Sequence, residues 1–117
     1  QPANSANLSK GIAPAFYIVP QNGEDLYYEP GFKELIDGIG IEDLWFDDNY
    51  VIPTDQVNER VGILKNVEAD GKFVLVTDYP TTQENICDFY ENCWQVPFAC
   101  RVFHRDLKWS FAYDCDN

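Results

Sequence analysis

The chain has few basic residues, and this shortage limits the partners that it can bind. Of its 117 residues, 8 are Lys or Arg and 20 are Asp or Glu, which gives a formal net charge of −12. Proteins bind nucleic acid through a basic surface, and an acidic protein is repelled by anionic membranes. We therefore expect no nucleic-acid partner, whereas a polycationic partner or substrate would be attracted. The alternative is that the acidity only keeps a secreted protein soluble.

Several motifs of common enzyme and metal sites are also absent. No G-x-G-x-x-G or Walker loop occurs, which disfavours a nucleotide-binding sheet, and no G-x-S-x-G elbow is present for acyl transfer. The cysteines lack the C-x₂-C spacing of zinc sites, and the adjacent Asp47 and Asp48 lack the spaced acidic residues of a calcium loop. No apolar run is long enough to span a membrane. The sequence therefore predicts no cofactor, no metal site and no membrane span.

Four cysteines lie in the last third of the chain, namely Cys87, Cys93, Cys100 and Cys115. Their clustering predicts two local disulfides and hence an oxidising location, outside the cell or on its surface. Four cysteines allow three pairings. We expect Cys100 to pair with Cys115, which leaves Cys87 and Cys93, and these two can bond only if their helix ends before Cys93. The glycosylation sequon at Asn7 agrees with secretion.

Short apolar runs bounded by helix and strand breakers predict buried strands. They lie near residues 15–20, 38–42, 73–77 and 99–103, and none has the alternating pattern of a one-sided sheet. Between them, helical spacing predicts short helical turns within residues 24–37 and helices at about 55–69 and after residue 81. Strands that alternate with helices predict an α/β fold with parallel strands and helices on one side of the sheet. Such strands could belong to a doubly wound sheet or to half of a barrel.

The starts of the two longer helices carry capping residues. Thr54 follows Pro53 and is expected to be the N-cap of the first of them. Thr81-x-x-Glu84 has the pattern of a capping box and is expected to begin the next helix.

Polar side chains follow each predicted strand. They are Gln21, Asn22, Gly23 and Glu24 after the first strand, Glu42 and Asp43 after the second, Asp78 and Tyr79 after the third, and Arg101 and His104 at the fourth. The carboxyl ends of parallel strands carry the functional residues of α/β folds. Carboxylates beside amides and an aromatic ring are typical of a sugar site, and glycoside hydrolysis needs two carboxyl groups. Ordinary alternatives exist, because Glu42 could be a loop carboxylate, Asp78 a turn residue and His104 a packing residue.

Four segments resemble the endo-α-1,4-polygalactosaminidase-like glycoside hydrolases. Residues 16–24 (FYIVPQNGE) are similar to the fifth strand of that family and residues 36–46 (IDGIGIEDLWF) to the sixth. Residues 74–79 (VLVTDY) are similar to the seventh strand, and Pro97-Phe98 with Arg101 to the eighth. The resemblance implies a partial (β/α)₈ barrel, strands five to eight, with residues 1–117 as a single domain that forms the C-terminal half.

The resemblance also implies an activity and a set of residues. The family consists of secreted or surface hydrolases that cleave galactosamine-containing polysaccharide. Its proposed catalytic glutamate, at the end of the sixth strand, falls on Glu42. We expect substrate to be bound by Gln21, Asn22, Asp78, Tyr79 and Arg101.

The second catalytic carboxylate of the family has no counterpart in this sequence. It is an aspartate within a D-G-v-x-L-D type motif on the fourth strand, and no such motif occurs. A complete barrel needs about 250 residues. The chain is therefore expected to be part of a longer protein, or to be completed by another chain or by a second copy of itself. The alternative is a carbohydrate-binding or structural extracellular protein that kept the scaffold without the catalytic pair.

Overall fold

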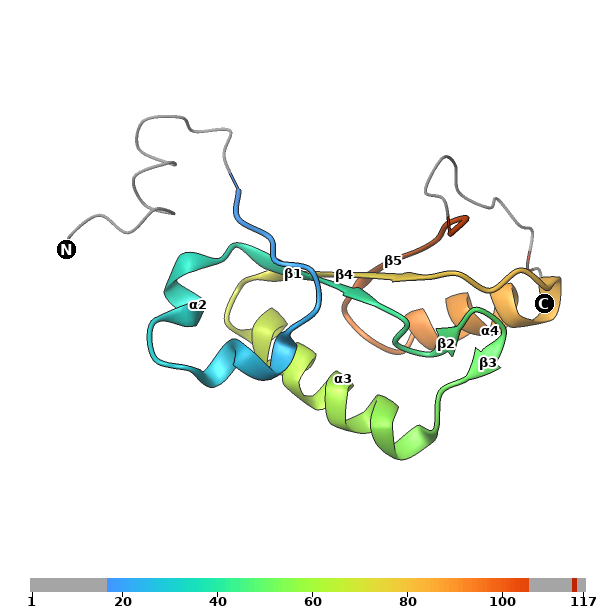
Figure 1. Ribbon diagram of the computed structural model, residues 1–117, viewed down its shortest axis with the longest axis horizontal. Coiled ribbons are helices and arrows are strands. Elements are labelled where there is room, and N and C mark those ends of the chain that lie inside the picture. The colour runs from blue at the N-terminus through green and yellow to red at the C-terminus, as the bar shows by residue number, and fades with distance from the viewer. Residues whose placement is uncertain (1–16, 106–114, 116–117) are drawn as a thin grey trace.

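A computed structural model describes residues 17–105 and residue 115 of the chain (Figure 1). The 3₁₀ helix η1 (Glu24–Tyr28) and the short helix α2 (Phe32–Leu35) come first, followed by the strand β1 (Gly38–Glu42). A two-stranded hairpin, β2 (Phe46–Asp47) and β3 (Tyr50–Val51), then leads into the long helix α3 (Thr54–Ala69). The strand β4 (Phe73–Asp78), the helix α4 (Gln83–Cys93) and the strand β5 (Ala99–Val102) complete the order.

The three longer strands form one parallel sheet in the order β1-β4-β5. In its register, Gly40 lies opposite Leu75 and Glu42 lies opposite Thr77, while Thr77 lies opposite Arg101 on the other side. The predicted α/β class and the predicted parallel pairing are confirmed. Three of the four predicted strands are present within one residue of their expected bounds.

The first predicted strand, near residues 15–20, is not formed as a regular strand. Residues 15 and 16 lie outside the described residues, and residues 17–20 are extended along the free edge of β1. The N–H groups of Asp37 and Gly40 donate to the carbonyls of Ile18 and Pro20, at 2.8 and 2.9 Å. Gln21 forms a single parallel bridge to Gly40. Because Pro20 has no N–H to donate, the ladder is interrupted there and the segment stays an irregular edge.

The helices α3 and α4 both lie on the same side of the sheet (Figure 1). Their apolar stripes, which include Leu64, Val67, Ile86 and Phe89, are buried. The sheet side chains that face them are also buried, and these are Ile39, Ile41, Val74, Val76 and Val102. The predicted placement of helices on one side is therefore confirmed for α3 and α4.

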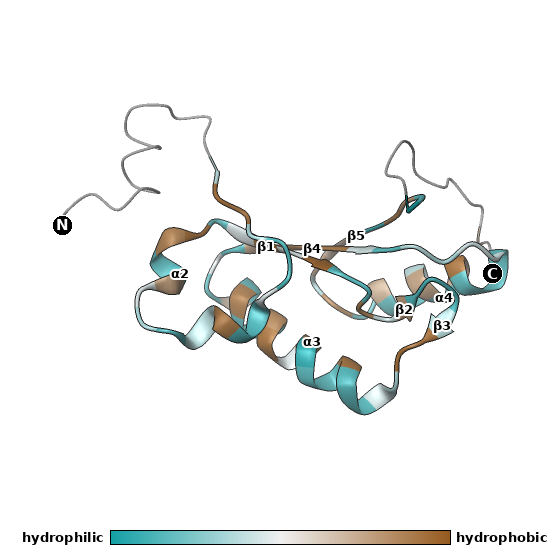
Figure 2. Cartoon of the chain, in the orientation of Figure 1, coloured by the Kyte–Doolittle hydropathy of each residue, from teal (hydrophilic) through white to brown (hydrophobic). Residues whose placement is uncertain are grey.

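The opposite face of the sheet, which we call the open face, has no layer packed on it among the described residues. Phe73 and Leu75 of β4 point to this face and are 46% and 40% exposed, so β4 alternates between exposed and buried residues. This corrects the expectation that the strand at residues 73–77 would be buried, because one of its faces is exposed. Both faces of β4 carry apolar side chains, and Figure 2 shows hydrophobic segments along the sheet. A strand with apolar residues on both faces is typical of a sheet that is covered on both sides.

The two predicted helix caps are each displaced by one residue. Thr54 is the first residue of α3, and its N-cap position is occupied by Pro53. At the start of α4 the cap is Thr82, whose hydroxyl accepts from the N–H of Asn85 at 3.2 Å. Thr81 instead accepts a hydrogen bond from the Asn49 side chain at 2.7 Å. The turn between β2 and β3 thus binds the residue that the capping-box pattern had indicated.

The two expected disulfides are present, but their pairing differs from the prediction. Cys87 is joined to Cys115, and Cys93 is joined to Cys100. Since α4 continues to Cys93, Cys87 and Cys93 lie about 240° apart around the helix and cannot meet. Cys93 instead reaches β5 across the turn that follows the helix.

No helix within residues 17–105 has both the length and the apolar character needed to cross a bilayer.

The observed pairing predicts different losses of stability when each disulfide is removed. In the chain-entropy model, replacing Cys93 and Cys100 by Ser should cost about 2 kcal/mol of unfolding free energy, and replacing Cys87 and Cys115 about 3.5 kcal/mol. The second value is larger because that bond spans 28 residues rather than 7. Chemical denaturation of the two double variants measures both losses. A non-reduced digest that links Cys100 to Cys115 would contradict the pairing.

Candidate functional site

A buried carboxylate organises the loop that follows β1. The Asp78 side chain is fully buried at the end of β4. One of its oxygens accepts from the N–H of Leu44 at 2.9 Å, and the other accepts from the N–H groups of Trp45 and Phe46 at 2.9 and 3.0 Å. Three consecutive backbone donors therefore converge on one side chain. We call residues 42–46 the Glu42 loop.

The burial of Asp78 changes its titration. Removal from water raises the pKa of Asp78 to about 6, and the nearby charge of Asp43 acts in the same direction. The hydrogen bonds from the three backbone N–H groups oppose this shift, because they favour the charged form. Asp78 is thus a structural carboxylate whose ionisation is linked to the fold of the loop.

Arg60 holds the same loop from the helix side. Its guanidinium donates to the backbone carbonyls of Glu42 and Asp43 at 3.3 and 3.0 Å, and to the carboxylate of Glu24 at 2.5 Å. Glu24 is itself almost fully buried. On the edge of the sheet, the side-chain oxygen of Asn22 accepts from the N–H of Glu42 at 2.9 Å. Both the amide and the carbonyl of Glu42 are therefore fixed by side chains from other elements.

The Glu42 side chain lies in a pocket at the carboxyl ends of the parallel strands. The pocket has a volume of about 320 Å³ and is lined by Gln21, Glu42, Thr77, Tyr79 and Phe103. The hydroxyl of Tyr79 donates to one oxygen of Glu42 at 2.6 Å. Burial, followed by the hydrogen bond to Glu42, raises the pKa of Tyr79 well above its ordinary value, so the phenol stays protonated and remains a donor.

Gly40 makes room for one wall of this pocket. A Cβ atom at Gly40 would collide with the side-chain oxygen of Gln21. The missing side chain therefore lets Gln21 lie across β1, next to Glu42. A carboxylate, an amide, a hydroxyl and an aromatic ring can together donate and accept hydrogen bonds from a sugar and contact its apolar face.

The structure brings together three of the predicted site residues and separates the others. Gln21, Glu42 and Tyr79 line one pocket. Asn22 and Asp78 lie behind it, where they hold the backbone of the Glu42 loop. Arg101 is exposed on β5, on the same face as Thr77, but does not line the pocket. The predicted glycosylation residue, Asn7, lies outside the described residues.

No pattern in the sequence predicted that Thr77, Phe103, Arg60 or Arg105 would be part of this site. Thr77 lines the pocket because it lies near the end of β4, which pairs with β1. Phe103 lines it because it follows β5, which pairs with β4 at the same edge of the sheet. The alternation of side chains along β4 could have indicated Thr77, since it shares a face with Glu42. Arg60 and Arg105 reach the site from distant parts of the chain, and no local pattern marks them.

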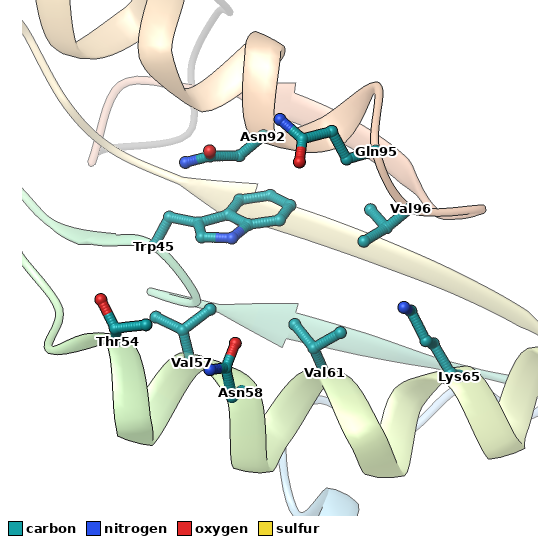
Figure 3. A pocket seen from close by; sticks show the side chains of 9 residues that line it. All are labelled: Trp45, Thr54, Val57, Asn58, Val61, Lys65, Asn92, Gln95 and Val96. Atoms are coloured by element: carbon teal, nitrogen blue, oxygen red, sulfur yellow. The ribbon is translucent and has the colours of Figure 1, made fainter.

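A second hollow lies between α3 and α4, on the other side of the sheet (Figure 3). Its volume is about 340 Å³, and Trp45 lies between the side chains of the two helices. Trp45 is only three residues from Glu42 in the sequence, but its ring packs edge-on against Phe89 in the core. The lining residues are Trp45, Thr54, Val57, Asn58, Val61, Lys65, Asn92, Gln95 and Val96. They include no carboxylate, so this hollow offers none of the acid–base chemistry of the Glu42 pocket.

No family model matches the chain. Among curated proteins, an uncharacterized protein of Methanocaldococcus jannaschii is 40% identical over an alignment of 79 residues that covers 62% of the chain and 23% of that protein. An uncharacterized protein of Thermotoga maritima is 28% identical over an alignment of 100 residues that covers 75% of the chain and 31% of that protein. An uncharacterized protein of Staphylococcus haemolyticus is 39% identical over 46 residues, 38% of the chain and 46% of that protein. The matched part of the chain thus spans about a quarter to a third of the length of the first two relatives.

The role of Asp78 predicts a specific loss of stability. Asp78→Asn places an NH₂ group against at least one backbone N–H, so the unfolding free energy at pH 7 should fall by about 1–3 kcal/mol.

The wild-type chain should also show a pH dependence of its stability that the Asp78→Asn variant lacks. Folding raises the pKa of Asp78 from 3.8 to about 6, so the folded state binds this proton more tightly. Stability should therefore fall as the pH rises from about 4 to about 6, by up to about 3 kcal/mol.

Chemical denaturation at several pH values between 4 and 7 tests both effects. Asp88→Asn, which changes an exposed aspartate of α4, is the matched control and should retain the wild-type pH profile. An identical pH profile for the wild type and for Asp78→Asn would show that Asp78 does not contribute this linkage.

Proposed function

We propose that the chain is part of a secreted glycoside hydrolase that acts on galactosamine-containing polysaccharide, with Glu42 as one of its two catalytic carboxylates. The observation that carries the proposal is the Glu42 carboxylate itself. It ends a parallel strand, lies in a pocket of about 320 Å³, and is held by the Tyr79 hydroxyl beside Gln21 and Thr77. The resemblance of residues 16–24 and 36–46 to the polygalactosaminidase-like family supports the same role, and two disulfides agree with secretion.

The open face of the sheet supports the proposal that the chain is half of a (β/α)₈ barrel. In such a barrel the helices lie outside, and side chains from neighbouring strands fill the interior. Phe73 and Leu75 project from the face opposite α3 and α4, where interior residues of a barrel would lie. The relatives from Methanocaldococcus jannaschii and Thermotoga maritima are several times longer than the segments that match, which leaves room for four further strands. We assign the edge segment at residues 18–22 to the fifth strand of the barrel, and β1, β4 and β5 to the sixth, seventh and eighth strands.

The mechanism that we propose needs a second carboxyl group from the rest of the barrel. One carboxyl group protonates the leaving oxygen of the glycosidic bond, and the other attacks the sugar or activates a water molecule. Glu42 would take one of these roles and an aspartate on the fourth strand the other. One Glu42 oxygen accepts from Tyr79, while its second oxygen accepts no hydrogen bond from the described residues. That second oxygen is the one left for the substrate.

The charge of the chain supports a substrate that carries free amines. A galactosamine polymer without acetyl groups is cationic, and the formal net charge of the chain is −12. Asp43, Asp47 and Asp48 lie around Arg105 next to the Glu42 pocket, and together they exceed its single positive charge. An acidic surface of this kind raises the rate at which a cationic chain is captured.

A second candidate function is carbohydrate binding without catalysis. It is favoured by the pocket lining, in which Glu42 is the single carboxylate among the described residues. One carboxylate with an amide, a hydroxyl and an aromatic ring can bind a sugar but does not provide the pair that hydrolysis needs. The two candidates differ in whether the complete protein releases new reducing ends.

Replacing Glu42 tests the catalytic assignment. In the complete protein, Glu42→Gln should lower the rate of polymer hydrolysis by about 10² to 10⁴, because the amide cannot transfer a proton. Fold and sugar binding should change little, since the amide oxygen can still accept from Tyr79. Reducing-end release measures the rate, and Glu59→Gln on the exposed side of α3 is the control. Full activity of Glu42→Gln would rule out the assignment, and the isolated 117-residue chain should be inactive.

The proposed electrostatic capture predicts a strong dependence on salt. Binding of the de-N-acetylated polymer should weaken steeply as NaCl rises, because exposed charges are screened beyond about 8 Å at physiological ionic strength. The fully N-acetylated polymer lacks the positive charges and should bind more weakly at low salt. Calorimetric titration of the two polymers at low and high NaCl makes the comparison. Equal, salt-independent binding would leave the acidity with a role in solubility alone.

A further inference from the structure

Arg105 stacks on the tyrosine that holds Glu42. Its guanidinium carbon lies 3.9 Å from the centre of the Tyr79 ring. A guanidinium over the face of an aromatic ring is attracted to the negative charge of that face, and its flat shape restricts how the ring can tilt. Tyr79 is only 3% exposed, so the stacking acts on a ring that is already enclosed.

Arg105 is itself held by three acidic residues, which are Asp43 of the Glu42 loop, Asp47 of β2 and Asp48 of the turn between β2 and β3. Its Nε and one terminal nitrogen donate to the same oxygen of Asp48, at 3.2 and 2.8 Å. The same terminal nitrogen lies 3.4 Å from a carboxylate oxygen of Asp43 and 3.6 Å from one of Asp47. The Arg105 side chain is 49% exposed, and ion pairs in that setting contribute little to stability. These contacts orient the guanidinium over the Tyr79 ring and add little to the stability of the fold.

These contacts form a closed path that begins and ends at Glu42. Glu42 is followed directly by Asp43, Asp43 contacts Arg105, Arg105 covers the Tyr79 ring, and the Tyr79 hydroxyl donates to Glu42 at 2.6 Å. Movement of the ring would change the direction of that hydrogen bond and hence the orientation of the carboxylate. The other Glu42 oxygen, which is the one proposed to meet the substrate, would turn with it.

We propose that Arg105 is a positioning residue that acts through Tyr79 to fix the carboxylate of Glu42. The proposal rests on the proposed function of Glu42 but makes a structural claim that can be tested without it. It also gives the acidic residues Asp43 and Asp48 a specific role, which is to hold Arg105 over the ring.

The test is a double-variant cycle read out at the Glu42 carboxyl group. Glutamate labelled with ¹³C in its side-chain carboxyl is incorporated into the complete protein, and the Glu42 resonance is identified by its loss in Glu42→Gln. Arg105→Ala should shift this resonance when Tyr79 is present. In the Tyr79→Phe background, where the hydroxyl is gone but the ring remains, Arg105→Ala should shift it much less. Arg105→Lys keeps the charge without the planar stack and should give an intermediate shift.

Lys65→Ala removes a positive charge from α3, on the other side of the sheet, and should leave the resonance unchanged. Circular dichroism checks that each variant is folded, and Arg105→Lys carries the test if Arg105→Ala is not. An unchanged Glu42 resonance in Arg105→Ala would overturn the proposal. An equal shift with and without the Tyr79 hydroxyl would overturn it too, because the effect would then come from charge alone.

Kinetics on the galactosamine polymer separates this inference from the proposed function. If both hold, Arg105→Ala and Tyr79→Phe should each lower kcat by about 10- to 100-fold with little change in KM, and the double variant should be no slower than Tyr79→Phe. If the wild type does not hydrolyse the polymer while the NMR coupling is present, the proposed function fails and the positioning role of Arg105 stands.

Discussion

The site depends on one set of interactions, in which the buried carboxylate of Asp78 accepts hydrogen bonds from three consecutive backbone N–H groups. A loop that leaves a strand and enters the core carries amide groups that lose their water, and each needs a partner. Asp78 satisfies those of Leu44, Trp45 and Phe46, while the carbonyl of Thr77 accepts from Asp43 and the side chain of Asn22 accepts from Glu42. Every backbone N–H from residue 42 to residue 46 is therefore hydrogen-bonded, and these bonds hold the backbone that carries Glu42.

The two faces of the parallel sheet have different roles, because one packs against the helices and the other carries the candidate site. Residues of β4 that point toward the helices are structural, as Asp78 and Val76 are, while Thr77 points to the open face that carries Glu42. A shift of one residue in the register would exchange the two sets. The same division explains why Trp45, only three residues from Glu42, belongs to the core between α3 and α4. Residues that are close in the sequence thus have side chains on opposite faces of the sheet.

Much of this arrangement could be predicted from the sequence, and the part that could not has a clear physical cause. The strands at residues 38–42 and 73–77 were predicted because breakers bound their apolar runs, and Gln21, Glu42 and Tyr79 were brought together because parallel strands end at the same edge. Which of Asp78 and Tyr79 faces the pocket depends on strand register, which composition does not contain. The partners of Arg60 and Arg105 lie 17 to 62 residues away, and disulfide pairing depends on where α4 ends. Strand register, the contacts of the two arginines and the end of α4 are all properties of the folded chain.

The irregular edge beside β1 has a consequence for how the site can open. Gln21 and Asn22 both belong to the segment whose ladder Pro20 interrupts, and one forms a pocket wall while the other holds the amide of Glu42. Segments at a sheet edge with few backbone bonds separate from a fold at lower free energy than its centre does. Brief detachment of residues 18–22 would widen the pocket and loosen Glu42 while the helices and the three-stranded sheet stayed intact. Widening the pocket in this way would require only local separation of the edge segment, without movement of the core.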